Sequence, residues 1–220
     1  MVVRLGAAAR RTLGPRSPTY AARVSTNGQA ATSAPHEFSA AVASLGAVPV
    51  RPEVQLEPIR PPDRLAPWSY ALGAEVVCGG EEIASGRLVL LHDPAGHEAW
   101  DGTLRLVSYV TAELDEEMAG DPLLARVGWL WLTDALEAHR ARFTAAGGTV
   151  TQTASTRFGD IAGPETTIDI ELRASWTPLD VDLVPHVQAW VDVLSAAAGL
   201  PPPGVSALPP AGAPARPVLT

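Results

Sequence analysis

Five side chains of the types that bind metal ions or transfer protons fall within ten consecutive positions, in the stretch GRLVLLHDPAGHEAWDG at 86–102. They are His92, Asp93, His97, Glu98 and Asp101. Imidazole and carboxylate groups brought together across a turn could hold zinc, so His92, Asp93, His97 and Asp101 are candidate metal ligands. The segment HEAWD departs from the zinc-protease motif, because its fifth residue is aspartate and nothing indicates a helix there.

The same stretch also has the residue pattern of a tight turn. Asp93, Pro94 and Gly96 occupy the first, second and fourth positions of a type I turn. The pattern favours a hairpin in which His92 ends one strand and the other candidate ligands lie in a solvated loop. We therefore predict no metal site, no cofactor and no catalytic residue. A metal-dependent enzyme or metal-binding protein centred on this hairpin is the alternative.

A second candidate site is aromatic, in GWLWLTDALEAHRARF at 128–143. At helical spacing the two tryptophans fall on two different apolar stripes: Trp131 with Leu123, Val127 and Leu130, and Trp129 with Leu132, Leu136 and Phe143. A helix that is apolar on two sides is usually buried between two layers, so we expect core packing. The alternative is an exposed groove for a partner, or a ligand pocket lined by Trp129, Trp131 and Trp176.

A third candidate is a charged face of the expected sheet. Its arginines are Arg87, Arg105, Arg157 and Arg173, interleaved with Glu75, Glu113 and Glu171. Cross-strand charge pairs on a solvated face are the ordinary interpretation of such a pattern. The alternative is a surface that binds an anion or a partner protein, because guanidinium groups suit carboxylates and phosphates.

Hydrophobic periodicity predicts the elements that would position these candidates. Helices are expected at 35–47, 122–146 and 183–198, and strands at 69–78, 85–93, 103–114, 149–159 and 166–176. Asp121-Pro122 would begin the long helix and Gly147-Gly148 would end it. Val54 and Leu56 indicate a short edge strand, since the prolines that follow exclude a central one.

The order α-β-β-β-α-β-β-α with short connections predicts an α+β fold with a mainly antiparallel sheet of about five strands and helices packed on one face. The same order occurs in the type III secretion chaperone-like fold, an analogy of topology that carries no function. We expect one domain at 35–200, between a disordered Arg-rich tail at 1–34 and a disordered Pro-rich tail at 201–220.

Composition limits the partners. Residues 37–220 carry eleven Arg against twenty-four Asp and Glu, a net charge of −13, so nucleic-acid binding by the folded part is disfavoured. Apolar runs are too short for a membrane span. Cys78 is the only cysteine, which excludes an internal disulfide. We expect a cytoplasmic protein that binds neither membranes nor nucleic acid.

Several segments resemble one actinobacterial family, the domain of unknown function 3000. They are VRPEVQLEPIRPPDRLAPWSYALGAEV (50–76), GRLVLLHDPAGHEAWDGTLRLVSYV (86–110), DPLLARVGWLWLTDALE (121–137), TAAGGTV (144–150) and LRASWTP (172–178). His92, Asp93, Pro94 and Trp100 fit the family pattern, in which position 97 need not be histidine, and this counts against His97 as an indispensable ligand. The resemblance covers most of 37–204 and implies a cytosolic, single-domain actinobacterial protein, with no activity or cofactor to carry over.

The expected function is therefore non-catalytic. With no catalytic motif and one open sheet face, the sequence favours an adaptor or chaperone-like module that binds another protein or a second copy of itself. The metal site at His92 and Asp93 and the Trp-lined pocket are the alternatives.

Overall fold

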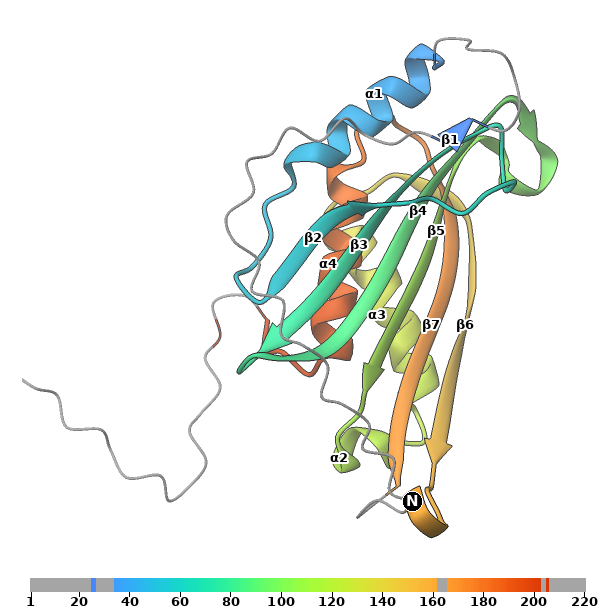
Figure 1. The fold of residues 1–220 in the computed structure, drawn as a ribbon. Coiled ribbons are helices and arrows are strands. Elements are labelled where there is room, and N and C mark those ends of the chain that lie inside the picture. The colour runs from blue at the N-terminus through green and yellow to red at the C-terminus, as the bar shows by residue number, and fades with distance from the viewer. Residues whose placement is uncertain (1–24, 27–33, 162–165, 203–204, 206–220) are drawn as a thin grey trace, which may run out of the picture.

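The computed structural model describes residues 25–26, 34–161, 166–202 and 205, which form an antiparallel sheet with helices on one face (Figure 1). The tails expected at 1–34 and 201–220 lie almost entirely outside these residues. The elements are β1 (Ser25–Thr26), α1 (His36–Ser44), η1 (Leu45–Ala47), β2 (Val54–Ile59), β3 (Trp68–Cys78), β4 (Glu81–His97), η2 (Glu98–Trp100), β5 (Gly102–Glu113), α2 (Glu116–Ala119), α3 (Leu124–Ala138), β6 (Phe143–Ser155), η3 (Gly159–Ile161), β7 (Thr167–Pro178) and α4 (Val184–Ala197). The predicted α+β class and element order are confirmed.

The strand order across the sheet is β1-β3-β4-β5-β7-β6, and β2 also pairs with β3. Every pair is antiparallel. Short connections account for this between consecutive strands such as β3 and β4 or β4 and β5. The strand expected around Val54 and Leu56 is present as β2, and among the described residues it pairs only with β3. Within the described part of the chain, no helix is long and apolar enough to cross a bilayer.

The core lies between the sheet and helices α1, α3 and α4. Alternate residues of β7 are buried, as its sequence pattern predicts: Ile170, Leu172, Ala174 and Trp176. Phe38 from α1 and Trp190 from α4 are fully buried in the same cluster. A side chain on every second strand position therefore meets a helix, and its neighbours face the opposite side of the sheet.

The long helix predicted at 122–146 is shorter in the structure. The prediction that Gly147-Gly148 would end it is wrong. Helix α3 stops at Ala138, and Arg140 follows with a left-handed φ of 57°. The amides of Arg140 and Ala141 donate to the carbonyls of Glu137 and Leu136, which is a Schellman ending without glycine.

The glycine pair lies instead inside β6, where the chain passes close to β7. A Cβ on Gly148 would lie 2.3 Å from the Arg173 carbonyl oxygen and 2.9 Å from the Trp129 ring. The strand register also shifts between Thr144 and Gly147. The missing Cβ of Gly148 therefore permits the close strand contact, and the left-handed residue at the register shift is Ala145 (φ 49°).

The tight turn predicted at Asp93–Gly96 is also displaced. Strand β4 continues to His97, and its register with β5 shifts between His92 and His97, so 93–96 form an irregularity within the ladder. Asp93 Oδ1 accepts the Ala95 amide at 3.0 Å, which keeps the kink local. The chain reverses later, through η2 and the left-handed Asp101 (φ 56°).

Candidate functional site

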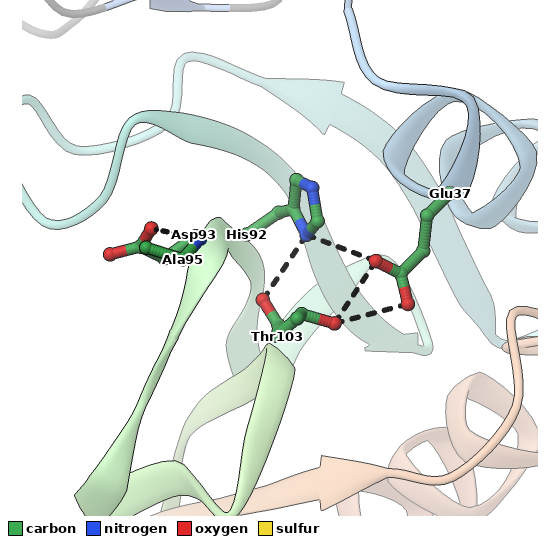
Figure 2. Close-up of polar contacts among 5 residues, drawn as sticks. All are labelled: Glu37, His92, Asp93, Ala95 and Thr103. Carbon is green, nitrogen blue, oxygen red and sulfur yellow. Dashed lines mark hydrogen bonds and ion pairs between the residues drawn. The ribbon is translucent and has the colours of Figure 1, made fainter.

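His92 is buried at the end of the sheet, under α1. Its side chain is 1% exposed and stacks on Phe38 with ring centroids 5.9 Å apart. Nδ1 donates to the Thr103 carbonyl at 3.1 Å and lies 3.7 Å from Glu37 Oε2. Thr103 Oγ1 lies 3.0 Å from both Glu37 oxygens, and Figure 2 shows the three side chains converging from α1, β4 and β5.

This arrangement pairs a carboxylate with a histidine, but it gives the histidine no access to a substrate. Nε2 of His92 is buried and has no hydrogen-bond partner among the described residues. A general base needs its reactive nitrogen within hydrogen-bond reach of the proton that it removes. The contacts of His92 with Glu37 and Thr103 therefore link α1 to the sheet, with Nε2 of His92 enclosed.

The other candidate metal ligands do not converge on His92. Asp93 points away from it and holds the Ala95 amide (Figure 2). His97 Nδ1 accepts the Ala99 amide at 3.2 Å, and its ring stacks on Trp100. Asp101 accepts the Thr144 hydroxyl at 3.3 Å. Across the described ranges, no group of three His, Cys, Asp or Glu side chains is placed to hold a metal ion.

The three candidate pocket tryptophans lie in three different settings. Trp176 is fully buried, Trp129 is half-buried where α3 meets Gly148 of β6, and Trp131 is half-buried against the core. Leu123 and Leu130, on the stripe of Trp131, are 59% and 43% exposed. The core packing expected of that stripe is therefore wrong at these two leucines, because no element among the described residues covers their side chains.

Trp176 also fixes a second buried histidine. Its Nε1–H donates to His186 Nδ1 at 3.0 Å, which places the hydrogen of the neutral imidazole on Nε2. Burial lowers the pKa of His186 to about 4, against the raising influence of Asp180 and Asp182. His186 is therefore a neutral core residue.

The face of the sheet opposite the helices is partly covered at one end. Ala66, Ala71, Val89 and Leu91 form a small buried cluster there, with Ile59, Trp100 and Val107 packed against it. The tip of the β4–β5 hairpin thus lies on the sheet at this end.

Arg105 lies on this face and is only 9% exposed, although its position in the strand predicted a solvated side chain. Its guanidinium donates to the Ala145 carbonyl at 2.8 Å and to the hydroxyls of Ser175 (2.7 Å) and Thr177 (3.1 Å). Thr177 also donates to the Trp100 carbonyl. Desolvation lowers the pKa of Arg105, and its neighbours close it off from ligands.

The rest of this face is open, and Tyr109 lies at its centre with 36% exposure. Tyr109 Oη donates to Glu171 Oε2 at 2.9 Å, Arg173 Nε lies 2.7 Å from Glu171 Oε1, and Arg173 Cζ lies 5.6 Å from the Tyr109 ring centroid. The hydrogen bond to Glu171 raises the pKa of Tyr109, and the same bond lowers the pKa of Glu171. The side chains of Tyr109, Glu171 and Arg173 therefore serve as one another's hydrogen-bond and charge partners.

Beside this cluster runs a groove of about 710 Å³ over β2, β3, β4 and β5. Its charged lining is Glu57, Glu75, Glu82 and Arg87. All four side chains are exposed, and within the described chain none of them forms an ion pair. We call the space that these four residues border the open-face groove.

The four arginines predicted to lie on one surface therefore occupy different settings. Arg87 and Arg173 lie in one row across the sheet, on either side of Tyr109. Arg105 is buried, and Arg157 lies beyond the end of β6. The sequence pattern missed Glu37 as the neighbour of His92, and it missed Glu57 and Glu82 in the groove, because each is brought in by a different element.

Comparison with known proteins identifies the family. Residues 34–206 match the sequence model of a protein family described as a protein of unknown function, DUF3000. The chain belongs to the DUF3000 family. No curated protein matches it, and no solved structure matches it. The topological analogy to a type III secretion chaperone therefore stays a prediction, and the DUF3000 assignment brings no residue roles with it.

Proposed function

We propose that this protein is a cytoplasmic, non-catalytic adaptor or chaperone-like module that binds a segment of another protein in the open-face groove. The observation that carries the proposal is the set of four exposed charged side chains, Glu57, Glu75, Glu82 and Arg87, which border one groove without pairing among themselves.

The contrast with the adjoining cluster supports this function. Glu171 and Arg173 are tied to each other and to Tyr109, so they have little capacity for a new contact. The groove charges have no such internal partners in the described chain. Charges displayed in this way favour selectivity and the rate of association more than affinity.

The lining also indicates the chemistry of the partner. Three carboxylates and one guanidinium suit a segment with several basic side chains and one acidic side chain. The exposed Tyr109 ring at the groove adds an aromatic contact surface of the kind enriched in protein interfaces.

The test compares four tagged full-length proteins, the wild type and three variants, as baits in lysate from the cells that naturally produce the protein. Arg87→Glu and Glu75→Arg reverse one charge of each sign in the groove, and Arg126→Glu reverses an exposed charge on α3. Captured proteins are quantified by mass spectrometry, and the candidate partner is then purified and titrated calorimetrically against each variant.

We expect one partner whose affinity falls about tenfold with either groove variant, the effect of losing one well-placed charged contact, and is unchanged with Arg126→Glu. Circular dichroism confirms that the variants are folded. A partner that is equally sensitive to all three variants, or to none, would contradict the proposed site.

A further inference from the structure

We infer that β6 joins two copies of this chain into a homodimer through antiparallel pairing of the two β6 strands. This inference is independent of the proposed partner groove, because it concerns the edge of the sheet and not its open face. The two edges of the sheet, β2 and β6, differ in their protection against further pairing.

The β2 edge has features that discourage further pairing. It contains Pro58, which has no amide hydrogen, and Glu57, and Pro52 and Glu53 precede it. Proline and charge are the usual means by which proteins protect an edge strand.

The β6 edge has none of this protection along 147–155. That segment, GGTVTQTAS, contains no charged residue and no proline. In the described chain β6 pairs only with β7, so half of its amides and carbonyls point away from the sheet. Long, uncharged, Thr-rich edges of this kind are ready templates for another strand.

The sequence of the edge selects a second copy as the occupant. Thr149-Val150-Thr151-Gln152-Thr153 has threonine at every second position in both directions, so it is nearly symmetric about Thr151. A two-fold axis at Thr151 places Thr149 of each copy opposite Thr153 of the other, which gives two equivalent threonine pairs. Threonine pairs directly opposite each other are favourable in antiparallel sheets.

Charges on the neighbouring strand are compatible with this register. Arg173 lies beside Thr149 and Asp169 beside Thr153, so one row of the joined sheet has Arg173 at one end and Asp169 of the second copy at the other. These two ends are about 14 Å apart at ordinary strand spacing. No like charges are brought directly opposite each other, since Thr151 separates the two copies of Glu171.

Two double variants test the joint and its register together. T149E/T153E would place glutamate opposite glutamate at both symmetric pairs, and T149E/T153K would place glutamate opposite lysine. Both positions are exposed, and the second variant also suits Arg173 and Asp169 within the chain. Sedimentation velocity over a wide concentration range measures self-association, and thermal melting confirms that each variant is folded.

We expect a wild-type dimer, a dissociation constant about tenfold higher for T149E/T153E, and recovery with T149E/T153K. Hydrogen exchange at 149–153 should slow as the dimer becomes populated. A monomeric wild-type protein would overturn the inference. So would a dimer that T149E/T153E leaves intact, a failure of T149E/T153K to recover it, or unchanged exchange in β6.

Discussion

The two faces of β5 differ sharply in exposure, although neighbouring residues of the same strand form them. Leu106 and Val110, on the helix-covered face, are 0% and 1% exposed, while Tyr109 on the opposite face is 36% exposed. The covered face contributes apolar burial, and the open face contributes polar groups at the surface. In this protein neighbouring residues of one strand therefore alternate between a face packed under the helices and a face left open.

Each face nevertheless contains an exception, and the two are accommodated differently. On the covered side, His186 of α4 stays neutral and accepts from Trp176 of β7, so no charge is buried. On the open face, Arg105 keeps its donors satisfied by a carbonyl and two hydroxyls. The partners are uncharged in both places: an indole N–H for Nδ1 of His186, and a carbonyl and two hydroxyls for the Arg105 guanidinium.

The largest effect should come from a matched pair of truncations on β5. Leu106→Ala removes a fully buried side chain and should lower the free energy of unfolding by about 2–5 kcal/mol. Tyr109→Ala, three residues along the strand, should lower it by at most about 1 kcal/mol. Urea denaturation measures both. Equal losses would show that the open face contributes as much to stability as the core does.

The next effect is a pH dependence that belongs to the covered face. The pKa of His186 is about 4 in the folded chain, against 6.5 for an unperturbed histidine. Between these two pH values His186 is therefore mostly protonated in the unfolded chain and mostly neutral in the folded chain. This contribution is complete above pH 6.5 and is lost as the pH falls from 6.5 toward 4. It amounts to about 3 kcal/mol over that interval.

His186→Gln supplies the control for this dependence, because glutamine does not titrate. Both proteins are denatured at a series of pH values from neutral to pH 4. The free energy of unfolding of the wild type, relative to that of the variant, should fall steadily as the pH falls. Parallel curves for the two proteins would mean that His186 has the same pKa in the folded and the unfolded chain, as a solvated imidazole would.

Local patterns were enough to predict the layout of the fold, because alternation and helical spacing are consequences of what each element buries. The ends of elements were harder. Gly147-Gly148 suits a helix end as well as a crowded strand, and only the approach of Arg173 in β7 distinguishes the two. Asp93-Pro94 likewise suits a turn or a bulge, and the pairing of His97 with Gly102 decides for the bulge.

The candidate site was less predictable than the fold for a related reason. Strand alternation predicted a solvated Arg105, because it does not show that the hairpin tip and the bulge at Ala145 cover this side chain. The approach of Glu37 to His92 joins residues far apart in the chain. Such contacts depend on how whole elements pack, which no single stretch of sequence specifies.

The smallest effect should be seen on the open face, where Glu171 holds the Tyr109 phenol. Glu171→Gln removes the negative charge that accepts the phenolic hydrogen, so the pKa of Tyr109 should fall toward the ordinary value of a tyrosine. The remaining shift would come from desolvation, which also raises the pKa of Tyr109 and is partly offset by Thr111 and Arg173. Ultraviolet titration of the phenolate in wild type and variant isolates the change, with Tyr109→Phe identifying its signal. An unchanged titration would mean that solvent screens this contact, in which case Glu171 and Arg173 are as free to meet a partner as the charges of the open-face groove.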